Sequence, residues 1–179
     1  MNKQIIDSRI LVIVAIIMVA ALARLIPHPP NVTPLAAMAL FGGAYLGDRR
    51  LALMVPFGAL LLSDLLLGFH ATMSFVYAGF ALTVLLGARV IGERRGVMRI
   101  GGTAIAASLL FFLITNFGVW IIYPMYPHTA AGLIDSYVAG LPFLRNSLLG
   151  DIFFVTVIFG GFALAAKGIP ALRTGTVRS

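Results

Sequence analysis

Few side chains in this chain could bind or transform a ligand. Most of them lie at those ends of the apolar segments that are expected to meet on one side of the molecule. They are Arg24, His28, Asp64, His70, His128, Asp135, Arg145 and Asp151. The other eleven of the thirteen Lys and Arg residues fall in the remaining connections and at the termini. Carboxylate, guanidinium and imidazole groups hold polar ligands, so we expect a binding site at the end of the molecule that carries the histidines.

Asp64 is the sharpest single candidate, because it lies in the leucine-rich run Leu61–Leu67. A carboxylate in a membrane helix costs several kcal/mol unless it faces the bundle interior and is paired or hydrated. Arg24 lies at comparable depth in the first apolar segment and is the natural countercharge for Asp64 or for an anionic ligand group. The alternatives are a structural bond from Asp64 to a neighbouring helix end and an Arg24 that snorkels to the lipid headgroups.

A stripe of polar and aromatic side chains follows one face of the predicted helix 103–123. Phe112, Asn116, Trp120 and Tyr123 have a 4-4-3 spacing, and Ser108 lies two turns before Asn116. Such a face offers an amide and aromatic surface to a flat ligand. The alternative reading is that the Trp and Tyr are interface anchors, whereas a lipid-facing Asn116 would be unsatisfied.

Asp151 is expected in the first turn of the last apolar segment, 148–166. A carboxylate there is favoured by the helix dipole even without a function, which is the alternative to a role in ligand binding.

Three histidines, His28, His70 and His128, come from three different predicted loops. They could meet as metal or haem ligands with Asp64 or Asp151, although no diagnostic spacing links them. The chain has no cysteine, so thiolate ligands and cysteine nucleophiles are excluded. Recognition of an organic ligand by one or two histidines, or a plain loop position for each, are the other readings.

The composition requires lipid as the solvent for this chain. Hydrophobic residues make up 60% of the 179 residues and charged residues only 11%, and the mean hydropathy is +1.03. The formal charge of +7 comes from short segments between apolar runs, as the positive-inside rule describes, so we expect no nucleic acid partner. No phosphate-binding loop of the G-x-x-x-x-G-K-[ST] type occurs.

We predict an all-α fold in which residues 1–179 form a single transmembrane domain of six helices. The expected spans are residues 10–26, 34–46, 51–69, 74–91, 103–123 and 148–166. The first of them has features of a cleavable leader, and we expect it to be retained as a helix. Lysine and arginine counts place both termini in the cytoplasm.

Two segments depart from ordinary spans. The second helix is short, and the spacing of Ala39, Gly43 and Gly47 predicts close packing of another backbone, or else a flat wall under a ligand. The connection 124–147 is too polar to span the membrane. We expect it to hold a short interfacial helix near 130–139 that covers the bundle mouth like a lid.

The residues also resemble a known family. The stretch from Arg24 to Ala44, RLIPHPPNVTPLAAMALFGGA, is similar to a motif of small uncharacterised bacterial membrane proteins. Further matches are Ser63-Asp64, Gly68-Phe69-His70, Thr115 to Trp120, Pro142-Phe143 and Gly150-Asp151. In size, span count and topology that family is similar to the substrate-binding S components of energy-coupling factor transporters. That resemblance implies an outward-facing site for a vitamin or metal ion, and docking on an ATPase module. An S-component-like protein that transports alone is the alternative.

The sequence therefore predicts a protein of the bacterial inner membrane that captures a small metabolite, such as a vitamin or cofactor precursor, without covalent chemistry. We expect no catalytic residue, no resident metal and no cofactor. The predicted ligand-binding residues are Arg24, His28, Asn31, Asp64, His70, Asn116, Trp120 and Asp151. The competing classes are a metal- or haem-handling protein or enzyme, and an assembly subunit without a ligand.

Overall fold

The computed structural model describes the backbone of residues 3–173 and the side chains of residues 8–48 and 50–173. Within this range the chain is helical and contains no strand, so the all-α prediction is confirmed. The elements are α1 (Lys3–Ala23), α2 (Leu35–Tyr45), α3 (Arg49–Leu67), α4 (Met73–Leu86), the π-helical turn η1 (Gly87–Ile91), α5 (Val97–Ile122), α6 (Ala130–Gly168) and the 3₁₀ turn η2 (Pro170–Leu172). Arg178, one of the predicted cytoplasmic basic residues, lies outside the described residues.

Four helices are long and apolar enough to cross a membrane. They cover Arg50–Leu67, Met73–Ile91, Val97–Ile122 and Ala130–Gly168, and the shorter apolar helices are Ser8–Ala23 and Leu35–Tyr45. In lipid a helix satisfies all its backbone polar groups internally, which is why these apolar runs fold this way. The structure therefore supports a membrane protein and four of the six predicted spans.

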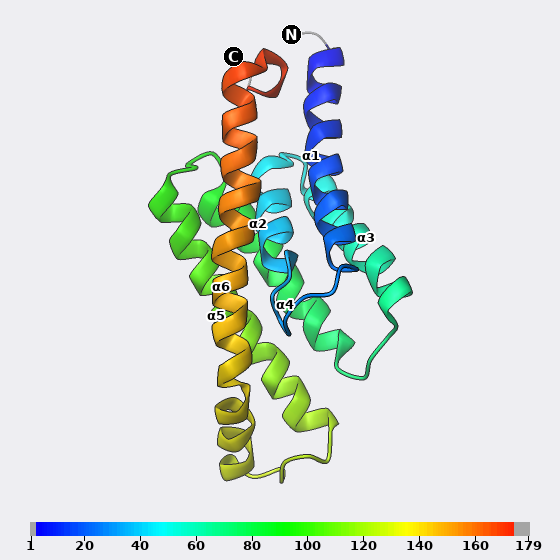
Figure 1. Cartoon of the computed structure of the whole chain (residues 1–179), viewed down its shortest axis with the longest axis vertical. Coiled ribbons are helices and arrows are strands. Elements are labelled where there is room, and N and C mark those ends of the chain that lie inside the picture. The colour runs from blue at the N-terminus through cyan, green and yellow to red at the C-terminus, as the bar shows by residue number, and fades with distance from the viewer. Residues whose placement is uncertain (1–2, 174–179) are drawn as a thin grey trace.

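The short helix α2 forms the centre of the bundle. It lies among the longer helices in Figure 1, and its residues Ala37–Ala44 are all buried. Phe41 packs edge-on against Phe159 and Phe162 of α6, with both ring centroids 5.3 Å away. At about 16 Å for 11 residues, α2 leaves space in the bundle beyond each of its ends.

Glycine allows α2 to touch α4 and η1 backbone to backbone. A Cβ atom on Gly43 would lie 2.1 Å from the Val84 carbonyl oxygen, and one on Gly87 would lie 2.4 Å from the Leu40 carbonyl oxygen. A Cβ on Gly47 would meet nothing within 4 Å. The predicted close packing of the stripe is therefore confirmed at Gly43 but not at Gly47.

The predicted lid is instead part of a long helical hairpin. Helix α6 begins at Ala130, capped by the Thr129 hydroxyl that accepts from Gly132 N (3.1 Å), and continues past Pro142 to Gly168. At about 58 Å it exceeds a hydrocarbon core of about 30 Å, and its first turns extend with α5 beyond the other helices (Figure 1). Ser136 and Gly140 are small buried residues of α6 that contact Asn116 of α5, and Gly132 lies against the Pro127 backbone in the connection between the two helices. These contacts fix the segment along α5, so it is not free to fold over the bundle.

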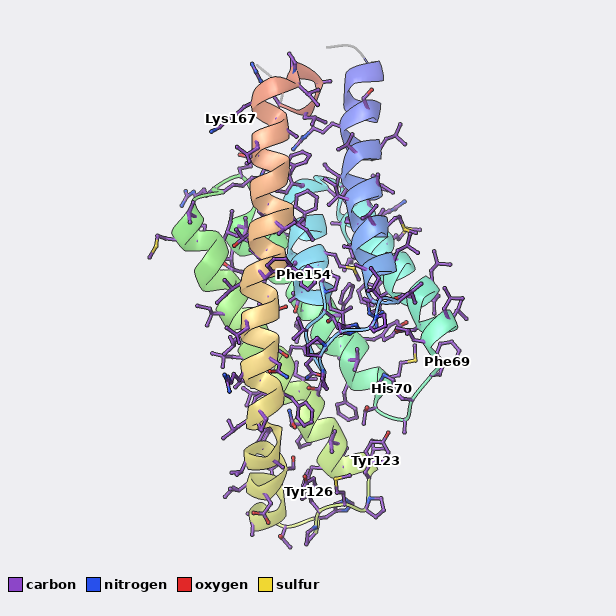
Figure 2. All side chains as sticks on the ribbon, in the orientation of Figure 1. Phe69, His70, Tyr123, Tyr126, Phe154 and Lys167 are labelled. Carbon is purple, nitrogen blue, oxygen red and sulfur yellow. The ribbon has the colours of Figure 1, made fainter. Side chains whose placement is uncertain are left out.

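The two ends of the bundle differ in charge. We call the end where α1 begins and α6 ends the basic end, since Arg50, Arg94, Arg95 and Lys167 lie there, and the opposite end the histidine end. Figure 2 shows Lys167 at the first and His70 and Tyr126 toward the second. At the basic end Asp48 caps α3 by accepting from Arg50 N (2.8 Å) and Leu51 N (3.0 Å). The N–H groups of Leu51 and Arg50 lower the pKa of the Asp48 carboxyl.

Candidate ligand-binding site

A cavity of about 280 Å³ lies near the start of α2, on its histidine side. It is lined by Arg24, His28, Asn31, Thr33, Leu35, Ala36, His70, Val76, Phe80, Thr83, Ser108, Phe111, Ser147 and Asp151. We call it the histidine-end cavity. Five of the eight predicted site residues are gathered here, although three separate segments of the chain supply them.

Arg24 forms one edge of the cavity and is held there by an ion pair with Asp64. Arg24 Nη2 lies 2.9 Å from Asp64 Oδ1, and the two side chains are only 11% and 7% exposed. Arg24 Nη1 also donates to Ser63 Oγ, and the buried hydroxyl of Tyr77 lies near the same pair. Asp64 itself does not line the cavity. Its carboxylate holds the Arg24 guanidinium at the wall, where the Arg24 Nε is buried and has no hydrogen-bond partner among the described residues.

Asp151 is a buried carboxylate that lacks a basic partner. Its side chain accepts a hydrogen bond of 2.6 Å from Ser108 Oγ, and the residue is 6% exposed. No described Lys, Arg or His forms an ion pair with it. Contrary to the prediction, Asp151 lies in the middle of α6 and not in its first turn, because the helix begins at Ala130. The dipole of the α6 N-terminus therefore does not explain this carboxylate, whereas a ligand with a donor group would satisfy it.

The loop between α1 and α2 is fixed against α6 next to Asp151. Asn146 Nδ2 donates to the Pro30 carbonyl oxygen (3.0 Å). A Cβ on Gly150 would lie 3.1 Å from Val32 Cα, so glycine lets the loop approach the helix. Asn31 has a φ of 63°, a left-handed conformation that Asn tolerates better than most residues. These contacts hold Asn31 at the cavity wall.

Two histidines reach the cavity from different loops. The His28 Nδ1 lies 2.6 Å from the Ile26 carbonyl oxygen, which only accepts, so Nδ1 carries the proton and Nε2 is left for another partner. The His70 Nδ1 lies 3.1 Å from Thr72 Oγ1. Both residues are exposed, so they form the polar rim of the cavity.

Asn116 and Trp120 lie outside the cavity, in the outer part of the α5–α6 hairpin. Asn116 Nδ2 donates to the backbone carbonyl oxygen of Phe112 in its own helix (2.9 Å). Ser136 Oγ donates to the backbone carbonyl oxygen of Asn116 (3.1 Å). Trp120 Nε1 donates to the Pro127 carbonyl oxygen (2.9 Å), and the Trp120 ring lies 5.4 Å from that of His128. The Trp120 side chain therefore links α5 to the connection before α6, and the Asn116 side chain is satisfied within its own helix.

The described residues do not bring the three histidines together. No group of three or more His, Asp or Glu side chains within the described part of the chain is placed to hold a metal ion. His128 packs on Trp120, away from the cavity that His28 and His70 line.

Sequence reasoning missed the apolar and hydroxyl part of the wall. Phe80 and Thr83 line the cavity from α4, which contains none of the predicted site residues, and Phe111 lines it from α5 beside the predicted stripe. The one available signal was Ser108, which shares a helix face with Asn116 and bonds Asp151 across the cavity wall.

Comparison with known proteins assigns a family but no activity. Residues 4–172 match the model of a family of unknown function, DUF6580. No curated protein and no solved structure matches the chain. Because the match spans nearly all of the sequence, the chain belongs to this family of unknown function.

Proposed function

We propose that the protein captures a small metabolite in the histidine-end cavity and delivers it for uptake, without covalent chemistry. The observation that carries this proposal is the gathering of Arg24, His28, Asn31, His70 and Asp151 around one cavity in an apolar bundle. Small-molecule sites typically combine mostly apolar walls with a few convergent polar groups. Phe80, Phe111 and Val76 provide the apolar wall here.

The polar groups favour a ligand that carries hydrogen-bond donors. Asp151 uses one oxygen on Ser108, and the carboxylate has further acceptor capacity. Arg24 is already committed to Asp64 and Ser63, so it contributes fewer free donors than a lone arginine would. An amine, amide or hydroxyl group of the ligand would complement Asp151, and the His28 Nε2 would complement another polar atom. A vitamin or cofactor precursor of modest size fits this description.

The location and partners belong to the same proposal. The arginine and lysine residues at the basic end support a cytoplasmic position for that end, so the histidine-end cavity would face outward in a bacterial inner membrane. The resemblance to S components, which rests on size, span count and topology, supports an ATPase coupling module as the energising partner. The lipid bilayer is the surrounding solvent for the four long apolar helices.

Native mass spectrometry of the gently purified protein tests the proposal directly. We expect a co-purifying small molecule, or binding of one after incubation with a metabolite extract, and at least a tenfold loss of binding for Asp151→Asn. Asp135→Asn is the matched control, because Asp135 is an exposed carboxylate in the same helix that does not line the cavity. Elemental analysis of the same sample separates a bound metal from an organic ligand.

The proposal fails if the folded protein binds no small molecule from a broad extract. It also fails if Asp135→Asn weakens binding as much as Asp151→Asn. A stoichiometric metal in the purified protein would instead support the metal-handling class. A stable protein partner without any ligand would support the assembly class.

A further inference from the structure

A second cavity lies at the basic end, where the last turn of α2 meets α3, α4 and η1. Its volume is about 490 Å³. Three arginines reach it from separate elements: Arg9 from α1, Arg89 from η1 and Arg95 from the loop before α5. We call it the basic-end cavity. It shares no lining residue with the histidine-end cavity.

Two of these arginines meet over one aromatic ring. The Arg95 guanidinium carbon lies 4.2 Å from the centroid of the Tyr45 ring, and the Arg9 guanidinium carbon lies 6.0 Å from it. Arg95 Nη2 donates to the Ala44 carbonyl oxygen (3.0 Å), which fixes the guanidinium plane at the end of α2. Two positive charges are thus held close enough to repel each other.

No carboxylate compensates this pair among the described side chains. Glu93 lines the same cavity but forms no ion pair with Arg9 or Arg95. The Nε atoms of both arginines are buried and have no hydrogen-bond partner among the described residues. Buried donors without an acceptor are costly, and guanidinium groups match phosphate oxygens in charge and geometry.

We propose that the basic-end cavity binds a phosphate-bearing anion between Arg9 and Arg95, above the Tyr45 ring. A single phosphate group would accept from both guanidinium groups and remove their mutual repulsion. This chemistry is shared by the headgroup of an anionic phospholipid in the adjacent leaflet and by a soluble phosphate compound. The proposal is independent of the ligand in the histidine-end cavity.

The test uses the purified full-length protein, delipidated in neutral detergent, with native mass spectrometry as the readout. One arm titrates phosphatidylglycerol against phosphatidylcholine, and the other titrates inorganic pyrophosphate. We expect saturable binding in at least one arm and at least a tenfold loss of affinity in Arg9→Gln/Arg95→Gln. Binding of phosphatidylglycerol alone identifies the lipid as the source, and binding of pyrophosphate alone identifies a soluble compound.

Arg94→Gln is the matched control. Arg94 is the exposed neighbour of Arg95 and does not line the cavity, so we expect less than a twofold change in affinity. If the double variant does not fold, we use Arg95→Lys instead. Lysine keeps the positive charge but lacks the planar guanidinium group that can donate two parallel hydrogen bonds to a phosphate. We expect that variant to bind several-fold more weakly than the wild type.

The proposal is overturned if neither probe binds, if Arg94→Gln loses as much affinity as the cavity variants, or if Arg95→Lys binds as well as the wild type. Asp151→Asn separates this site from the proposed uptake site. It changes ligand capture at the histidine end and should leave the affinity for phosphatidylglycerol or pyrophosphate unchanged.

Discussion

The two cavities at opposite ends of α2 differ in how their buried charged side chains are paired. At the histidine end, the Arg24 guanidinium is paired with Asp64 at 2.9 Å, and Asp151 is left as a carboxylate without a basic partner. At the basic end, Arg9 and Arg95 share the Tyr45 ring and have no carboxylate partner among the described residues. The first cavity therefore complements a donor-bearing ligand and the second an anion.

On the two proposals above, this difference separates charges that maintain the fold from charges that would bind a ligand. Removing a member of a buried ion pair exposes its partner to the full desolvation penalty. Removing one of two repelling arginines relieves an unfavourable interaction. The comparison thus predicts a large loss of stability in the ion pair at the histidine end and a small one at the basic end for substitutions that each remove one charge.

The largest effect is expected from breaking the Arg24–Asp64 pair. Asp64→Asn leaves the Arg24 guanidinium buried without its countercharge, and we expect a loss of about 3–5 kcal/mol in the free energy of unfolding. Denaturation in detergent, followed by circular dichroism, measures it. The double variant Arg24→Gln/Asp64→Asn should recover part of the loss. If the single and double variants are equally destabilised, the pair does not act as a unit.

The next largest effect is expected at the contact between α2 and α4. Gly43→Ala places a methyl group 2.1 Å from the Val84 carbonyl oxygen, so α2 must move away from α4. We expect a loss of about 1–3 kcal/mol, measured by the same denaturation experiment.

Gly47→Ala is the control for that substitution, because its Cβ would meet nothing within 4 Å. We expect its stability to stay within about 0.5 kcal/mol of the wild type. Equal losses in both variants would show that the effect comes from the helix end and not from contact between α2 and α4.

A smaller effect is expected at the basic end. Arg95→Gln removes the hydrogen bond to the Ala44 carbonyl oxygen and the contact with Tyr45, but it also removes repulsion with Arg9. We expect a net loss below about 1 kcal/mol. A loss as large as that of Asp64→Asn would contradict the distinction between the two cavities.

The sequence predicted the histidine-end cavity better than it predicted the outer hairpin. A carboxylate among leucines needs a partner in lipid, so the depth of Asp64 and Arg24 was enough to suggest that they meet. His28, Asn31 and His70 lie in predicted connections at the same end of the bundle, so the sequence was enough to place them near Arg24 and Asp64. For these inferences it was enough to know at which end of the bundle each residue lies.

Other features depended on contacts that no local pattern reports. Polar residues in 124–147 suggested a separate lid, but Ser136 and Gly140 allow the first part of α6 to lie along α5. Asn116 and Trp120 find backbone acceptors within the hairpin and so are not available to the cavity. The basic-end cavity was also missed, because positive-inside topology already accounted for every arginine that lines it.

Asp151→Asn is expected to change stability little, and the contrast with Asp64→Asn makes it the most discriminating substitution. The amide keeps the size of the side chain and can accept from Ser108, while it removes a buried charge that has no basic partner. We expect the free energy of unfolding to stay within about 1 kcal/mol of the wild type or to rise, in contrast to Asp64→Asn. Denaturation of the two variants side by side measures the difference. If Asp151→Asn is as destabilising as Asp64→Asn, then the carboxylate is part of the structural framework of the bundle, and the histidine-end cavity loses the group that most clearly awaits a ligand.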